Sequence, residues 1–155
     1  MKDYTILHMP IIKGIAIEVN AARTARTLSS LVASGVAIIQ AIDITADVVQ
    51  NSYHKAVLIE AKKEVEKGNP MSAVFSAHTD LYPVFVGEMV NVGEETGKLG
   101  GMLSDIASFY EKEVDQKTKN LSTVIEPILM IVIGAAVGLF AVSIISPIYS
   151  LVNNI

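Results

Sequence analysis

The sequence predicts an all-α protein, in which a small helical domain precedes a single C-terminal transmembrane helix. Apolar residues recur every three or four positions along most of the chain, which is the spacing of one helix face. Strand signals are short and lie inside this periodicity. Every residue from Pro127 to Ile155 is uncharged. A length of 155 residues suits one domain with one membrane anchor.

The composition argues against several classes of function. A formal net charge of -4 provides no basic surplus for a phosphate backbone, and aromatic residues make up only 6% with no Trp, so nucleic-acid binding is not expected. The chain has no Cys, so packing alone must hold the domain together, without disulfides or thiolate metal ligands. Hydrophobic residues make up 51% and the mean hydropathy is +0.46, which is high for a wholly soluble protein.

The uncharged C-terminal stretch is the strongest signal. The apolar run Ile128 to Ile145 nearly reaches the roughly 20 residues that a helix needs to cross a membrane, so we expect a transmembrane helix over residues 127–152. A buried core helix is the alternative, but such helices usually carry a polar edge. Lysines precede the stretch and no Lys or Arg follows it, which predicts a cytoplasmic domain over residues 15–126 and a short non-cytoplasmic tail at 153–155.

Two features of this stretch suggest contacts. Gly134 and Gly138 form a G-x-x-x-G pattern, which removes side-chain bulk from one helix face and lets another helix approach closely. Glu126 directly precedes Pro127, so its carboxylate stands at the hydrocarbon edge. There it either reaches the headgroups or finds a partner.

The domain before the stretch divides into helices separated by turn residues. We expect helices over residues 15–31, 38–49, 53–67, 72–78 and 84–95, then a long last helix that enters the membrane segment. Gly35 should end the first helix, because glycine tolerates the left-handed conformation, and the first two helices should form a hairpin. Pro83 is a favourable first-turn residue. Residues 1–14 are apolar but interrupted, and we expect this leading segment near the membrane surface.

No catalytic, metal or cofactor site is expected. The segment GEETGKLGG, residues 93–101, fails the P-loop pattern because Gly93 and Gly97 are too close and Leu99 stands where a hydroxyl is required. The histidines lack the spacing of metal ligands. The pair Asp43 and Asp47 could hold a cation, although a polar surface is the simpler interpretation. No nucleophile-and-base pattern is visible, so the sequence does not predict an enzyme.

Three ordered segments carry a family pattern. They are ARTLSSLVASGVAIIQAI at residues 25–42 (motif 1), LYPVFVGEMVNVGEETGKL at 81–99 (motif 2) and FYEKEVDQKTKNLSTVIEPILMIVIGAAVG at 109–138 (motif 3). In this order, and with the last one running into the membrane stretch, they resemble the GspF/PilC family of inner-membrane platform proteins of type II secretion and type IV pilus systems.

The resemblance implies an antiparallel helix bundle in the inner membrane, a platform that links a cytoplasmic assembly ATPase to pilin or pseudopilin subunits. Other inner-membrane components of the machine and further copies of the chain are implied partners. A membrane-anchored helical adaptor or signalling domain unrelated to secretion is the alternative. The family normally has two such domains and three spans, so this chain looks like a C-terminal half or a pared-down relative.

The resemblance also points to particular residues. The motif positions with an expected structural role are Gly35, Pro83, Gly93, Glu94, Gly97, Glu126 and Pro127. We expect Gly93 and Gly97 to set a corner between two helices and Glu94 to cap or pair locally. Gly100-Gly101 replaces helix-forming residues of the family, and an interior Gly costs a helix about 1 kcal/mol, so the long helix should begin near Met102. The exposed Glu and Lys faces are candidate surfaces for the ATPase.

Overall fold

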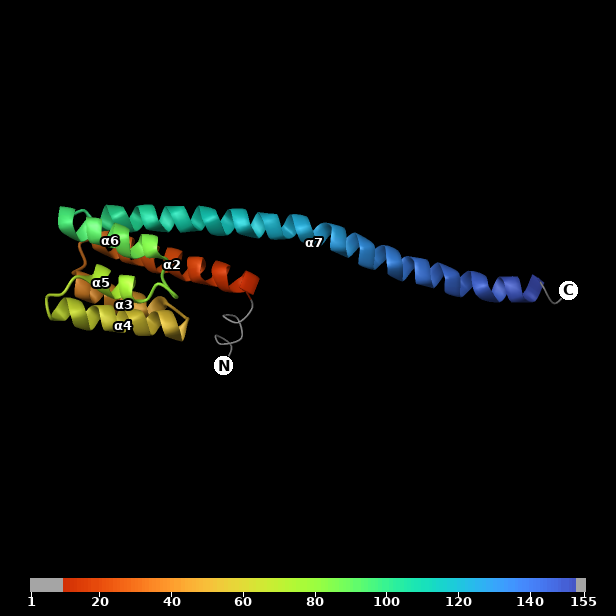
Figure 1. Ribbon diagram of the computed structural model, residues 1–155, viewed down its shortest axis with the longest axis horizontal. Helices are drawn as coiled ribbons and strands as arrows, with labels where there is room; N and C mark the ends of the chain where they lie inside the picture. The colour runs from red at the N-terminus through yellow and green to blue at the C-terminus, as the bar shows by residue number, and fades with distance from the viewer. Residues whose placement is uncertain (1–9, 153–155) are drawn as a thin grey trace. The chain divides into compact units, whose positions relative to one another are not determined.

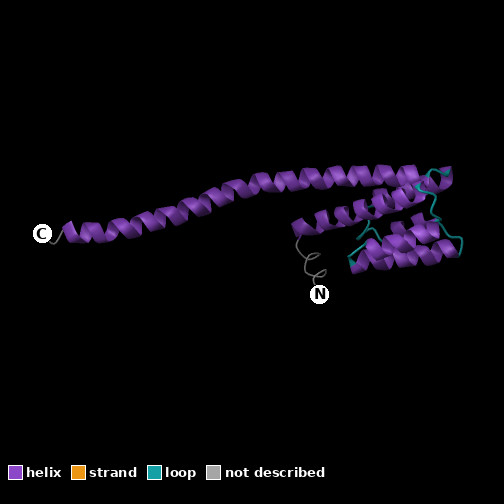
Figure 2. Cartoon of the chain, turned by 180° about the vertical axis from the view of Figure 1, so that it is seen from behind, coloured by secondary structure: helices purple, strands orange, loops and turns teal. Residues whose placement is uncertain are grey.

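The computed structural model describes residues 10–152, with side chains described for residues 13–120, 127 and 129–143. This part of the chain is helical with short loops and contains no strand, which confirms the predicted all-α class (Figure 1, Figure 2). The helices are α2 (Pro10–Ala33), α3 (Ile38–Val48), α4 (Ser52–Glu66), α5 (Met71–Ala77), α6 (Val84–Thr96) and α7 (Leu99–Val152). Their bounds lie within a few residues of the predicted ones, except at the starts of α2 and α7.

The chain divides into two compact units, Met1–Asp115 and Gln116–Ile155, and α7 belongs to both. The first unit holds α2 to α6 and the first turns of α7. In the second unit, α7 continues through Pro127 to Val152. Among the described residues, no helix combines the length and the apolar character that a membrane crossing requires. Most of the expected leading segment (residues 1–9) and the expected tail (153–155) lie outside the described residues.

Helix α2 begins earlier than the sequence suggests and ends where it suggests. It starts at Pro10 rather than Ile15, because proline is well tolerated in a first turn, where its missing N–H would have no helical partner. Residues 10–14 therefore belong to this helix. At the other end Gly35 adopts a φ of 83°, and the Val36 N–H donates to the Leu31 carbonyl at 3.0 Å. This left-handed cap turns the chain into α3, which packs on α2 as the predicted hairpin.

Helices α3 and α4 pack against each other along small and aliphatic faces. The buried side chains include Ala41, Ile42, Thr45 and Ala46 of α3 and Val57, Leu58 and Ala61 of α4. Asn51 starts α4, because its side-chain oxygen accepts hydrogen bonds from the backbone N–H groups of Tyr53 and His54 at 3.0 and 3.3 Å. The cap confirms the predicted break between the two helices.

The core centres on Tyr82, whose side chain is fully buried. Its ring meets the rings of Phe75 on α5 and His54 on α4 edge-on, with centroids 4.8 and 5.1 Å apart. Its hydroxyl shares a hydrogen bond of 3.1 Å with the hydroxyl of Thr24 on α2. One residue of the loop between α5 and α6 thus contacts three helices.

His54 is a polar residue inside this core. Its Nε2 lies 3.0 Å from the Leu81 carbonyl oxygen, which can only accept, so Nε2 carries the proton. Its Nδ1 is buried and has no hydrogen-bond partner in the described part of the chain. Burial lowers the pKa of the imidazole from its usual 6.5, more than the Leu81 carbonyl and the charge of Asp80 raise it. The folded domain therefore holds His54 neutral.

The start of α7 at Leu99 shows that the expected start near Met102 is wrong. Gly100 and Gly101 lie in the first turn of the helix rather than before it. The Ser29 hydroxyl of α2 donates to the Gly100 carbonyl at 2.9 Å, and a Cβ on Gly100 would lie only 3.4 Å from Val32. The hydrogen bond from Ser29 thus ties the first turn of α7 to α2 and helps to offset the low helix propensity of the two glycines.

His54 makes the stability of the domain depend on pH. Below about pH 6.5 the unfolded chain binds a proton at His54 that the folded domain binds only at lower pH, so stability falls as pH falls through this range. We expect the unfolding free energy to drop between about pH 7 and about pH 5. In His54→Gln, which keeps an N–H donor for Leu81 and does not titrate, the drop should be smaller. Urea unfolding of the full chain in detergent, followed by tyrosine fluorescence, measures it.

His78→Gln is the matched control for this prediction. His78 is partly exposed, and its Nε2 contacts Glu60 at 3.0 Å outside the core. This variant should keep the larger part of the wild-type pH dependence. Equal pH slopes in the wild type and in His54→Gln would show that the buried imidazole does not control the effect.

Candidate functional site

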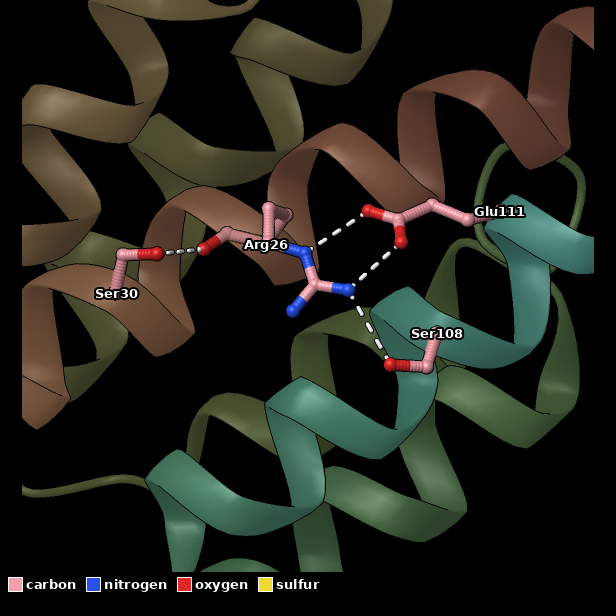
Figure 3. Close-up of polar contacts among 4 residues, drawn as sticks. All are labelled: Arg26, Ser30, Ser108 and Glu111. Carbon is pink, nitrogen blue, oxygen red and sulfur yellow. Dashed lines mark hydrogen bonds and ion pairs between the residues drawn. The ribbon is translucent and has the colours of Figure 1, made fainter.

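The charged residues Arg26 of motif 1 and Glu111 of motif 3 meet between α2 and α7 (Figure 3). Nε of Arg26 donates to one carboxylate oxygen of Glu111 at 2.9 Å, and Nη2 of Arg26 donates to the other at 2.7 Å. The two residues therefore form a bidentate, or two-pronged, ion pair. The same terminal nitrogen donates to the Ser108 hydroxyl at 3.2 Å. Together with the Ser29–Gly100 hydrogen bond, these contacts show that α2 and the first turns of α7 run antiparallel.

The pair orients the helices more than it stabilises them. The hydrogen bond from Arg26 lowers the pKa of the Glu111 carboxyl and raises the pKa of the guanidinium, so both groups stay charged near neutral pH. The two side chains are 43% and 48% exposed. Exposed pairs contribute roughly 0.2–1 kcal/mol, so the specific two-pronged geometry is the main consequence of this contact.

Glu94 of motif 2 lies on α6 and caps a different helix. Its two carboxylate oxygens accept hydrogen bonds from the backbone N–H groups of Met71 and Ser72, at 2.6 and 3.2 Å. The first N–H groups of a helix have no partner within it, and Pro70 at the start of α5 offers no side-chain acceptor. The carboxylate supplies that acceptor and a favourable charge for the helix dipole. The contact is not local, because Met71 and Glu94 are 23 residues apart.

Gly93 lies in the last turn of α6, and Gly97 directly follows this helix. Gly97 has a φ of 68°, and the Lys98 N–H donates to the Gly93 carbonyl at 3.0 Å, which closes the end of α6. Gly93 is buried, and a Cβ built on it would lie 2.9 Å from the Leu99 Cα. The first glycine therefore permits the close approach of the two helices, and the second permits the left-handed turn.

Pro83 and the described motif residues of the second unit take no part in the contacts above. Pro83 directly precedes α6, where its carbonyl accepts from the Val86 N–H at 2.8 Å. Pro127 is exposed within α7, whereas the side chain of Glu126 lies outside the described residues. A Cβ on Gly134 or Gly138 would meet no described atom within 4 Å. The structure thus brings motif 1, motif 2 and the first residues of motif 3 together in the first unit, whereas Pro127, Gly134 and Gly138 belong to the second unit.

The charged face of α4 is largely engaged within the domain. Lys62 pairs with Asp43 at 2.7 Å and Lys55 pairs with Asp47 at 3.1 Å, so both aspartates of α3 that could have formed a cation site face lysines instead. Among the residues that the structure describes, no group of His, Asp or Glu is arranged to hold a metal ion.

Reasoning from the sequence missed the residue pairs that join the motifs. Arg26 and Glu111 are 85 residues apart, and Thr24 and Tyr82 are 58 apart, so no local spacing connects them. A signal was nevertheless present, because Arg26, Tyr82 and Glu111 stand within the quoted motifs and carry the polar groups that helix contacts need.

Comparisons with known proteins agree with the motifs. The family described as "Type II secretion system (T2SS), protein F" matches residues 24–147. The type IV pilus assembly protein PilC of Pseudomonas aeruginosa is 40% identical over 152 residues, covering 97% of this chain and 40% of that protein. PilC of Thermus thermophilus is 35% identical over 99% of this chain and 38% of its own length. Type II secretion system protein F of Aeromonas hydrophila is 29% identical over 97% of this chain and 38% of its own.

The chain therefore spans about two fifths of the length of these curated relatives. The match extends over the helices that carry motifs 1, 2 and 3.

At the corner between α6 and α7, a methyl group added at Gly93 should destabilise the domain, whereas one added at Gly101 should not. Gly93→Ala should lower the unfolding free energy by about 1–3 kcal/mol, because its Cβ would overlap the Leu99 backbone. Gly101→Ala is the matched control, since a Cβ there meets no described atom within 4 Å, and it should be neutral or stabilising by up to about 1 kcal/mol. Urea unfolding of both variants measures the difference. Equal effects would show that the corner can adjust.

Proposed function

Because this chain belongs to the family of type II secretion system protein F, we propose that it is a platform component of a type IV pilus or type II secretion machine. In this role it couples a cytoplasmic assembly ATPase to pilin or pseudopilin subunits, together with other inner-membrane components and further copies of itself. The family match over residues 24–147 carries the proposal. The chain acts by contact with these partners, without catalysing a reaction.

The first unit is built to transmit force rather than to absorb it. Tyr82 is buried among three helices, Glu94 ties α6 to α5, and Arg26 ties α2 to α7. A close-packed core with such ties resists deformation, so a push on one face is passed to the others. This property supports coupling between a motor on one surface and filament subunits on another.

The α4 face is the candidate surface for the ATPase. Lys63 and Glu66 are exposed there, and the ion pairs found among the described residues do not include them. Their neighbours Lys55 and Lys62 are held by α3, which keeps the surface ordered. Exposed charges on an ordered surface suit a contact that must form and release, since such contacts are screened and individually weak.

The uncharged part of α7 is the proposed membrane anchor. Large apolar side chains from Leu129 to Val142 are between 53% and 72% exposed, and such a surface requires a cover. Lipid is the cover that fits, because no charged residue follows Glu126. We place residues 127–152 across the inner membrane as a single span, with residues 15–126 in the cytoplasm and 153–155 on the other side.

Gly134 and Gly138 lie one turn apart on this helix and leave open space around their backbone. In lipid, such a surface lets a second helix approach closely. We propose that this face contacts another span, from a further copy or from another component of the machine.

Deletion of this coding sequence in its host should abolish the surface filament or the secretion that the machine supports. The ATPase should also leave the membrane fraction, because its proposed anchor is lost. Electron microscopy of the cells and immunoblots of membrane fractions measure the two effects. The wild-type gene supplied in trans should restore both and thereby control for effects on neighbouring genes. Normal filaments and normal secretion in the deletion strain would refute the platform role.

The double variant Gly134→Ile and Gly138→Ile tests the anchor and its packing. It keeps the stretch apolar, so the chain should remain in the membrane pellet after alkaline carbonate extraction. Crosslinks from this helix to its neighbour should fall, since isoleucine forbids close approach.

The matched control introduces the same residue, isoleucine, at two positions that already carry a branched side chain. The double variant Val137→Ile and Val142→Ile should leave both extraction and crosslinking as in the wild type. Release of the wild-type chain by carbonate would contradict the membrane span. Unchanged crosslinking in the glycine variant would contradict the helix contact.

A further inference from the structure

An open groove of about 360 Å³ lies between α2 and the first turns of α7, within the first unit. Its lining is mostly apolar and includes Val19 and Ala22 of α2 and Val114 of α7. The residues that line it on α2 follow the i, i+3, i+4, i+7 spacing of one helix face. Two arginines, Arg23 and Arg26, border it on the same helix, and Glu111 borders it on α7.

The charges at the groove do not balance. Arg26 is paired with Glu111 through two hydrogen bonds, as Figure 3 shows. Arg23 is exposed, and its guanidinium makes no ion pair with any described side chain. One positive charge that has no ion-pair partner among the described side chains therefore stands beside an apolar surface.

We propose that this groove binds a helix of a partner protein that presents aliphatic side chains and one carboxylate. The aliphatic side chains fill the space over Val19, Ala22 and Val114, and the carboxylate pairs with Arg23. The inference rests on the proposed function, because a platform needs docking surfaces, and it adds the chemistry of one partner. An apolar helix laid in a groove between two helices is a recurring mode of recognition.

The spacing of the groove residues agrees with a helix as the occupant. Val19 and Arg26 are seven residues apart, which corresponds to about 10 Å along α2, or two turns of a partner helix. Arg26 is held by Glu111, so the recognition of charge falls on Arg23 alone. A partner with one acidic residue beside an apolar stripe satisfies both parts of the groove at once.

A lipid surface fits less well. Segments that bind anionic lipids carry clusters of about four to eight Lys or Arg residues. This face carries two, and Glu111 neutralises one of them. A single arginine without an ion-pair partner among the described side chains favours one protein carboxylate over a surface of anionic lipid headgroups.

Three synthetic helical peptides test the proposal. They share one leucine stripe and differ at a single flanking position, which is Glu, Gln or Lys. With the full chain in detergent micelles, fluorescence anisotropy should show the Glu peptide binding about fivefold more tightly than the Gln peptide, the scale of one solvent-exposed ion pair, and the Lys peptide binding most weakly. In Arg23→Glu this order should reverse.

Lys98→Glu is the matched control, because it makes the same charge change at an exposed residue of the turn between α6 and α7. It should keep the wild-type order of the three peptides. Equal binding of the peptides, or the same response in Arg23→Glu and Lys98→Glu, would overturn the inference. So would loss of binding to phosphatidylglycerol vesicles in Arg23→Glu without any peptide preference, which would make the groove a lipid surface.

The deletion experiment keeps this outcome separate from the proposed function. If filaments depend on the chain but the peptides are not distinguished, the groove inference fails and the platform role stands. If filaments form without the chain, the platform role fails whatever the peptides show.

Discussion

The burial of Tyr82 is the constraint on which the rest of the first unit depends. A fully buried tyrosine must find a partner for its hydroxyl, and Thr24 supplies it from α2. Its ring packs on His54 of α4 and Phe75 of α5, so one side chain sets the distance between three helices. Burial raises the pKa of Tyr82, which keeps the hydroxyl neutral. Pro83 follows directly and starts α6 from this anchored point.

Polar contacts at the edge of the bundle then select one arrangement of helices. Burying a large apolar side chain contributes about 1.5–3 kcal/mol, whereas an exposed ion pair contributes roughly 1 kcal/mol or less. Apolar packing therefore drives folding. The two-pronged Arg26–Glu111 pair and the Glu94 cap add direction, because each requires a specific orientation of its partners.

These features connect the fold with the proposed platform role. The bundle presents a charged face on α4 and an apolar groove beside Arg23, two surfaces of different chemistry on one packed body. Surfaces of different chemistry recognise different partners, so the proposed contacts with an ATPase and with filament subunits need not compete. The exposed apolar residues of α7 provide a third kind of surface, suited to lipid and to other spans.

The sequence by itself determined the helices and most of their ends, because helical periodicity and residues such as Gly35, Asn51 and Gly97 act through neighbours in the chain. It also carried the family pattern. Tertiary structure alone decided the pairs that join the motifs, since Arg26 and Glu111 are 85 residues apart and local spacing cannot connect them. It also moved the start of α7 to Leu99, because a hydrogen bond from Ser29 of α2 to the Gly100 carbonyl helps to offset the weak helix propensity of two glycines.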